Sequence, residues 1–177
     1  KKAAVLGSGV MGSGIAAHLA SAGVEVLLLD IVPKEGGRNS LAESAIEKLK
    51  KAKPALITHP KKLKNIIAGN LDDDLEALRE CDWIIEVVVE RLDIKKLIYD
   101  QVEKFRKPGT LVSSNTSGIP IHLMAEGRSE DFQKHFCGTH FFNPPRYLRL
   151  LEIIPTAKTD PAIIDFHMHY GDVFLGK

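Results

Sequence analysis

The sequence has few cysteines, no long apolar run and almost no net charge. Only two of its 177 residues are cysteine, Cys81 and Cys137, and their spacing matches no disulfide framework and no zinc motif. Isolated thiols of this kind are typical of buried side chains in a reducing compartment, so we expect a cytoplasmic protein. No apolar stretch approaches the ~20 residues of a membrane-spanning helix. The formal net charge of +1, with basic and acidic residues interspersed, argues against a nucleic-acid partner.

The two ends of the chain constrain its organisation. The start, Lys1-Lys2 followed by apolar residues, superficially resembles a secretory signal, but the glycines at positions 7, 9, 12 and 14 interrupt the apolar core that a signal requires. The length suits one α/β domain, residues 1–177, with a sizeable core. The chain begins directly with a strand pattern and stops just after a helical segment, so we expect a truncated domain.

The most informative stretch covers the first thirty residues. The apolar run Ala3–Leu6 ends at the glycine-rich segment Gly7-Ser8-Gly9-Val10-Met11-Gly12. Apolar residues at helical spacing follow, and then a second apolar run, Val24–Leu29, which ends in Asp30. This pattern predicts a strand, a tight turn, a helix and a second strand.

Each part of this unit has a role in binding a dinucleotide. Gly7 permits the turn, Gly9 lets the backbone approach a pyrophosphate, and Gly12 lets the helix pack closely on the strand. The unpaired N–H groups at the start of the helix would face the phosphates. Asp30 would accept hydrogen bonds from the adenosine ribose and repel a 2′-phosphate, which favours NAD over NADP. The expected residues of this half of the cofactor site are Gly7, Gly9, Val10, Met11, Gly12 and Asp30.

The rest of the chain alternates between strand and helix patterns. The apolar run Trp83–Val89 predicts a buried strand, and Leu92–Arg106 predicts an amphipathic helix. Gly69-Asn70 is expected to turn the chain, and Leu71–Arg79 has helix-like spacing. Further strands are expected over residues 110–113, 136–142 and 150–154, and further helices over residues 41–53 and after Asp160. This alternation predicts a Rossmann-type, doubly wound and mostly parallel sheet with helices on both faces.

Polar residues follow several of the predicted strands. In a doubly wound sheet, ligands bind beyond the carboxyl ends of the strands, so residues that are far apart in sequence meet there. We therefore expect one crevice to collect Gly7, Asp30, Glu90, Ser114–Ser117 and His140–Asn143.

Hydride transfer from an alcohol requires a base for the hydroxyl proton, and the sequence offers seven histidines. His140 follows a predicted strand in the segment Cys137-Gly138-Thr139-His140. His167 and His169 point apart on a helix, and we expect no metal site. Glu152 interrupts another apolar run, which is costly unless a partner satisfies the acid. It either orients His140, as the acid of a catalytic triad does, or faces water on an edge strand. The residues alone leave both alternatives open.

Taken together, in order and spacing, these motifs resemble the NAD-binding domain of 3-hydroxyacyl-CoA dehydrogenase, including forms fused to an enoyl-CoA hydratase. The resemblance extends from Lys2 to about Lys177. It implies NAD-dependent oxidation of a (3S)-3-hydroxyacyl-CoA to the 3-oxoacyl-CoA, a step of fatty acid β-oxidation. The matching motifs are Gly7–Gly12, Asp30, Val89-Glu90, Ser113–Ser117 and Gly138-Thr139-His140-Phe141-Phe142-Asn143-Pro144.

The same resemblance implies roles for individual residues. His140 is the expected general base, and Glu152 is its expected partner. Ser117 would hydrogen-bond the substrate, and Asn143 would line the same pocket, where substrate and cofactor meet. The remaining expected contacts are with the nicotinamide half of NAD, from Glu90 and Lys95, and with coenzyme A, from Ser44 and Lys51.

The family continues beyond this chain with a final strand and an all-helical domain. That domain shapes the acyl pocket, adds a catalytic asparagine and forms a homodimer, so the present chain alone is expected to turn over poorly. Two other functions are open alternatives. One is a related dehydrogenase of a free hydroxy acid or sugar acid, and the other is a non-catalytic NAD-binding module.

Overall fold

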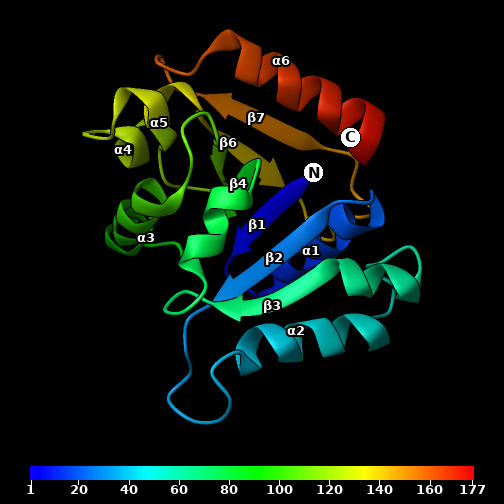
Figure 1. The fold of residues 1–177 in the computed structure, drawn as a ribbon. Coiled ribbons are helices and arrows are strands. Elements are labelled where there is room, and N and C mark those ends of the chain that lie inside the picture. The colour runs from blue at the N-terminus through cyan, green and yellow to red at the C-terminus, as the bar shows by residue number, and fades with distance from the viewer.

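Seven strands form one sheet in the computed structural model, which describes residues 1–177 throughout (Figure 1). The strand order is β3-β2-β1-β4-β5-β6-β7. All neighbouring strands are parallel except β6 and β7, which are antiparallel. The strands are β1 (Lys2–Leu6), β2 (Glu25–Asp30), β3 (Ile66–Asn70), β4 (Trp83–Glu86), β5 (Leu111–Ser114), β6 (Phe136–Phe141) and β7 (Leu151–Pro155). This arrangement confirms the expected Rossmann-type sheet.

Helices cover both faces of the sheet because successive strand residues point to opposite faces. From β1, Ala3 and Val5 pack into one core with α1, α2 and α6, while Ala4 and Leu6 pack into a second core with α3, α4 and α5. The helices are α1 (Val10–Ser21), α2 (Ser40–Lys51), α3 (Leu92–Phe105), α4 (Ile121–Ala125), α5 (Glu130–Lys134) and α6 (Pro161–Tyr170). Shorter turns are the 3₁₀ segments η1 (Pro60–Asn65) and η2 (Leu75–Glu80) and the π-helical segment η3 (Gly171–Leu175).

Two local expectations between β2 and β4 need correction. Gly69 and Asn70 belong to the end of β3, and the chain turns directly after them, where Oδ1 of Asn70 accepts hydrogen bonds from the amides of Asp72 and Asp73 at 3.0 and 2.8 Å. A Cβ on Gly69 would lie 2.6 Å from the Asp74 carboxylate and 2.7 Å from the Leu29 side chain, so glycine makes room for these two side chains. The helix expected over residues 71–79 is only the 3₁₀ turn η2.

The strand expected over Trp83–Val89 ends at Glu86. Its neighbour β1 ends at Leu6, which pairs with Glu86, so the following residues have no strand to pair with on that side. The amide of Val87 still donates to the carbonyl of Leu6 at 2.8 Å. Residues 87–89 then leave the sheet at the glycine turn.

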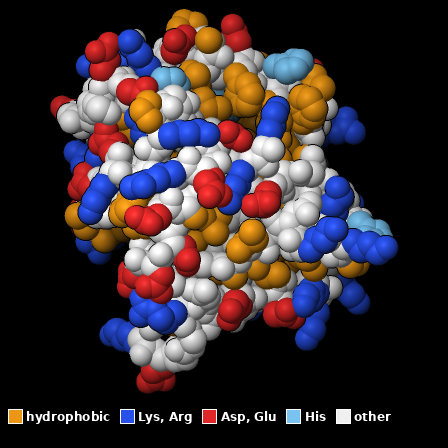
Figure 2. Space-filling view, in the orientation of Figure 1, with side chains coloured by type: hydrophobic (Ala, Val, Ile, Leu, Met, Phe, Trp, Pro, Cys, Tyr) orange, Lys and Arg blue, Asp and Glu red, His pale blue; other side chains and the backbone are white.

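The composition also led to expectations about charged surface residues, membrane-spanning helices and the two cysteines. Figure 2 shows basic and acidic side chains interspersed over most of one face. No helix of the structure combines the length and the apolar character needed to cross a membrane. Cys81 and Cys137 are buried and unpaired, as expected, and burial raises the pKa of their thiols to about 11 and about 12.

Candidate active site

The glycine turn after β1 gives each of its three glycines a distinct environment. Gly7 has a φ of +110°, and a Cβ there would lie 2.6 Å from the carbonyl oxygen of Val87. A Cβ on Gly12 would lie 1.8 Å from the carbonyl oxygen of Gly7, so the helix can approach the strand only with glycine at this position. A Cβ on Gly9 would meet nothing within 4 Å. The open space above Gly9 is where a ligand can approach the backbone.

The start of α1 provides hydrogen-bond donors to that open space. The first N–H groups of a helix have no partner within it. Gly9 occupies the N-cap position, and no side chain caps the helix. The amides of Val10 and Met11 are therefore suited to bind the phosphates of a dinucleotide, helped by the positive end of the helix dipole.

Asp30 is held beside this turn at the end of β2. Its Oδ2 accepts hydrogen bonds from the Ser8 amide at 2.7 Å and from the Ser8 hydroxyl, and its Oδ1 accepts one from the Ile31 amide at 2.7 Å. Each carboxylate oxygen can accept more than one hydrogen bond, so capacity remains for the ribose hydroxyls. The structure thus places Asp30 where the sequence motif requires it.

A cleft of about 450 Å³ joins the glycine turn to helix α2. Ser44 lies on this cleft together with Asp30, whereas Lys51 is exposed on the same helix and does not line the cleft. Lys48 also lines the cleft and was missed by the sequence analysis, although it is one helical turn from Ser44. The full lining is Ser8, Gly9, Val10, Ser13, Asp30, Leu41, Ser44, Ala45, Lys48, Leu49, Ala52 and Leu56.

His140 and Glu152 form a pair across the last two strands. The antiparallel register of β6 and β7 places the two residues directly opposite each other. The Nδ1 atom of His140 lies 2.7 Å from Oε2 of Glu152, and Nε2 makes no hydrogen bond within the chain. The Glu152 side chain is 48% exposed, because β7 is an edge strand. Glu152 thus combines the two alternatives, since it faces water and also contacts His140.

Loops that follow three other strands lie at the same edge of the sheet as the glycine turn. After β4, Val87 packs against Gly7, and after β6, the Pro145 side chain comes within 3.0 Å of a Cβ built on Gly14. After β5, the Oδ1 atom of Asn115 accepts a hydrogen bond from the amide of Phe141, next to His140, at 2.8 Å. Asn115 has no role of its own among those that the sequence motifs predict. Asn143 lies exposed in the loop between β6 and β7.

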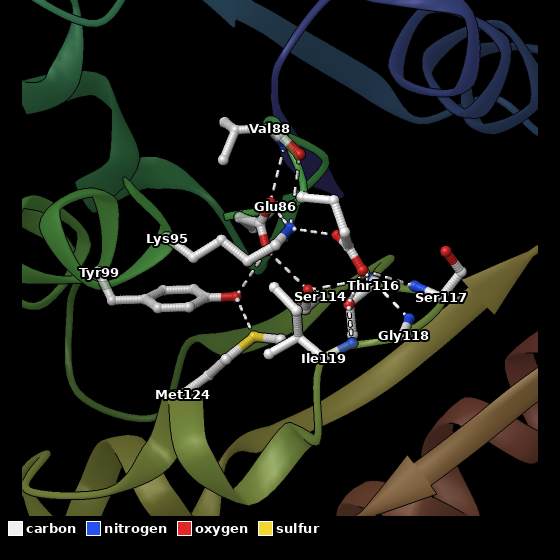
Figure 3. Close-up of polar contacts among 11 residues, drawn as sticks. Glu86, Val88, Lys95, Tyr99, Ser114, Thr116, Ser117, Gly118, Ile119 and Met124 are labelled. Carbon is white, nitrogen blue, oxygen red and sulfur yellow. Dashed lines mark hydrogen bonds and ion pairs between the residues drawn. The ribbon is translucent and has the colours of Figure 1, made fainter. Parts of the chain in front are cut away.

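Glu90 organises the loop that carries Ser117. Its Oε1 accepts hydrogen bonds from the amides of Ser117 and Gly118, at 3.1 Å each, and from the hydroxyl of Thr116 (Figure 3). Burial favours the protonated acid, but the hydrogen bonds from Thr116 and Gly118 and the charge of Lys95 outweigh it and lower the pKa of Glu90 to about 2. Glu90 is therefore anionic at neutral pH, and it holds the backbone on both sides of the Ser117 hydroxyl.

Lys95 lies behind Glu90 and not on the surface. Its side chain is 1% exposed, and its Nζ lies 3.2 Å from Oε2 of Glu90 and 2.7 Å from Oε1 of Glu86. The contact with nicotinamide that the resemblance implies for Lys95 stays a prediction. In this structure Lys95 is separated from the surface of the site by Glu90, which it contacts. Glu86 was missed by the sequence analysis, although an acid inside the apolar run from Trp83 was the same signal that drew attention to Glu152.

The comparisons with known proteins agree with this geometry. A family model described as 3-hydroxyacyl-CoA dehydrogenase, NAD binding domain, matches residues 2–177. The chain belongs to this family. Membership confirms the resemblance seen in the sequence and the expected cofactor, NAD.

Individual relatives of this NAD-binding domain are longer than the chain. A probable 3-hydroxyacyl-CoA dehydrogenase of Bacillus subtilis is 57% identical, and the match covers 100% of the chain but 24% of that protein. A probable 3-hydroxyacyl-CoA dehydrogenase of Deinococcus radiodurans is 53% identical over 100% of the chain and 51% of that protein. The crystal structure of 3-hydroxybutyryl-CoA dehydrogenase from Escherichia coli superposes with a TM-score of 0.84 at 30% identity, covering 100% of the chain and 37% of that structure. The chain thus spans between about a quarter and half of these relatives.

Two further histidines of this family member are structural. Burial lowers the pKa of His18 to about 4, and its Nε2 contacts the carbonyl oxygen of Leu175 at 3.1 Å. His167 is 2% exposed and packs against Trp83, with 4.9 Å between ring centroids, and burial lowers its pKa to about 4 as well. No cluster of three or more histidine, cysteine, aspartate or glutamate side chains is positioned to hold a metal ion.

Proposed function

We propose that the protein to which this domain belongs oxidises a (3S)-3-hydroxyacyl-CoA to the 3-oxoacyl-CoA with NAD, as a step of fatty acid β-oxidation. The observation that carries the proposal is the His140–Glu152 pair at 2.7 Å, in a fold of the 3-hydroxyacyl-CoA dehydrogenase family. A conserved fold alone would support only NAD binding. The pair supplies the proton acceptor that alcohol oxidation requires.

The residues around the first turn fit NAD. The open space at Gly9 admits a pyrophosphate, the amides of Val10 and Met11 can bind it, and Asp30 can accept hydrogen bonds from the ribose. When bound, NAD supplies the nicotinamide ring that accepts the hydride from C3 of the substrate.

His140 takes the proton of the 3-hydroxyl group at Nε2. The contact with Glu152 at Nδ1 keeps the proton of the neutral ring on Nδ1, so that Nε2 is the free acceptor. The carboxylate then stabilises the imidazolium that forms. General base catalysis of this kind contributes about 10²–10⁴ in rate.

Other residues position the substrate. Ser117 offers a hydroxyl whose backbone is fixed by Glu90, and Asn143 offers an amide in the loop after His140. Ser44 and Lys51 on α2 are the proposed contacts of coenzyme A, in agreement with the position of Ser44 on the cleft. We also propose that the full-length protein is a homodimer and that it works in the cytoplasm. The buried, unpaired cysteines support the location, since thiols stay reduced there.

The variant His140→Gln in the full-length protein tests the assignment. We expect turnover of 3-hydroxyacyl-CoA to fall by about 10²–10⁴ while NADH affinity stays near normal. The matched control is His169→Gln, since His169 is an exposed histidine on α6 outside the site. Unchanged turnover in His140→Gln would end the assignment. Equal turnover of the free 3-hydroxy acid and its coenzyme A thioester would favour a dehydrogenase of free hydroxy acids.

A further inference from the structure

Glu86 is a fully buried carboxylate directly below the loops of the candidate site. It is the last residue of β4 and is 0% exposed. Its Oε1 accepts hydrogen bonds from the Lys95 ammonium and the Val88 amide, at 2.7 Å each. Its Oε2 accepts from the Tyr99 hydroxyl at 2.9 Å and from the Ser114 hydroxyl at 2.6 Å (Figure 3). All of these partners donate hydrogen bonds to the carboxylate oxygens, so their arrangement suits an anion.

Such a carboxylate is costly to bury and is not needed to complete the core. Replacing a buried ion pair by apolar residues of similar volume is often neutral or stabilising. Glu86 is also the last residue of β4, at the carboxyl end of the strand where the loops of the candidate site begin, and not in the middle of the strand. Its position therefore indicates a role in arranging those loops.

One set of contacts fixes the loop after β4. The amide of Val88 donates to Glu86, and the carbonyl oxygen of Val88 is 3.4 Å from the Lys95 ammonium. The ion pair thus holds both backbone polar groups of Val88, the residue after Val87, which packs against Gly7.

A second set of contacts fixes the loop after β5. The hydroxyl of Ser114 donates to Glu86 and accepts from the amide of Thr116 at 3.2 Å. Lys95 is shared between Glu86 and Glu90, and Glu90 holds the amides of Ser117 and Gly118. Glu86 is therefore connected to the Ser117 loop by two routes, one through Ser114 and the other through Lys95 and Glu90.

We propose that Glu86 is a positioning residue that fixes the loops at residues 87–90 and 115–118 against each other, and so places the Ser117 hydroxyl and the Glu90 carboxylate for the nicotinamide half of the cofactor and the reacting carbon. This inference rests on the proposed function. Glu86 acts without touching substrate or cofactor, because it is covered by Lys95, Tyr99 and Ser114.

The variant Glu86→Gln changes the charge and almost nothing else. The amide fills the same volume, but its NH₂ group replaces the oxygen that accepts hydrogen bonds from the Tyr99 and Ser114 hydroxyls. The Lys95 ammonium keeps only Glu90 as a charged partner. Lys95 then draws the Glu90 carboxylate away from the Thr116 hydroxyl and the Ser117 and Gly118 amides. We expect both loops to loosen while the rest of the sheet stays intact.

The experiment compares two ligands in the full-length protein. NADH occupies both halves of the cofactor site, whereas ADP-ribose lacks nicotinamide and reports only on the Gly7–Asp30 half. For Glu86→Gln we expect kcat to fall by about 10- to 100-fold, as for a small misplacement of reacting groups, and NADH affinity to fall severalfold with ADP-ribose affinity unchanged. Amide hydrogen exchange of Val88, Ser117 and Gly118 should accelerate.

The matched control is Trp83→Phe, at the opposite end of the same strand. It removes the 2.9 Å hydrogen bond from Trp83 Nε1 to Ser113 and so perturbs the opposite face of the sheet from the one on which Glu86 contacts Tyr99. If Glu86→Gln weakens NADH and ADP-ribose equally, or changes kcat no more than the control does, Glu86 is only structural and the inference is wrong. Should Glu86→Gln fail to fold, Ser114→Ala, which cuts one of the two routes, must lower NADH affinity selectively for the inference to stand.

Failure of the proposed function gives a different result. If the unaltered protein does not oxidise 3-hydroxyacyl-CoA, the proposed reaction is wrong. The comparison of NADH with ADP-ribose still decides whether Glu86 positions the nicotinamide half, because that comparison requires no turnover.

Discussion

Replacing Gly9 by alanine should remove cofactor binding and leave the fold intact, whereas the same change at Gly12 should disrupt the fold itself. The two glycines are three residues apart in the same turn, yet their surroundings differ completely. A Cβ on Gly9 would meet nothing within 4 Å, but a Cβ on Gly12 would lie 1.8 Å from the carbonyl oxygen of Gly7. The two variants therefore distinguish the space that a ligand occupies from the space that the packing of α1 on β1 requires.

The expected free energies follow from these contacts. Gly9 has a φ of −62° and a ψ of −169°, which alanine adopts without strain, so we expect the free energy of unfolding of Gly9→Ala to change by less than about 1 kcal/mol. In Gly12→Ala the new methyl group meets backbone, which cannot rotate away, so helix α1 must move off β1. Overpacking in a core costs about 1–3 kcal/mol, and we expect this variant to lie at or above the upper end of that range.

Denaturant unfolding and NADH titration of the full-length protein measure the two effects. In Gly9→Ala the methyl group occupies the space that we assign to the pyrophosphate, so NADH affinity should fall at least about tenfold, equivalent to ~1.4 kcal/mol. In Gly12→Ala the loss of binding should accompany the loss of stability. Normal NADH affinity in a folded Gly9→Ala variant would refute the placement of the cofactor over this turn.

Two further predictions concern an acid and a histidine of the same domain. Glu152→Gln should keep the fold, since its side chain is 48% exposed. It should lower kcat by about fivefold, the equivalent of the ~1 kcal/mol that a solvent-screened pair contributes. Its pH–rate profile should shift, and an unaltered profile would show that Glu152 only faces water. Burial lowers the pKa of His167 from 6.5 to about 4, so below pH 6.5 the folded state binds fewer protons than the unfolded state. The free energy of unfolding should therefore fall by up to about 3 kcal/mol as the pH drops from 6.5 to 4. His167→Phe should reduce this decline in urea unfolding at pH 7.5 and 5, and an identical decline would contradict the assignment.

The amino-acid sequence by itself determined the features that depend on neighbours in the chain. The glycine turn, the helix after it and Asp30 at the end of the next strand follow from local backbone chemistry, since only glycine fits a φ of +110° at Gly7. The alternation of strand and helix patterns was enough to predict the doubly wound sheet. That sheet in turn predicted that His140 and Glu90 lie at the edge where ligands bind, and both residues lie at that edge.

Only the tertiary structure decided features that depend on packing between distant segments. Glycine is common in turns, but Gly69 pairs with Leu29 as part of β3, and the turn begins only after Asn70. Glu152 remains half exposed because no strand pairs with the outer edge of β7. The apolar residues around Glu152 in the sequence do not reveal that β7 is an edge strand. Lys95 shares the buried face of α3 with Tyr99 and Val102, and a charged side chain is accommodated there because Glu86, nine residues away, supplies the opposite charge. A buried charge depends on partners from other strands and helices. The contacts of Glu86 with Lys95, Tyr99 and Ser114 therefore could be found only in the folded chain.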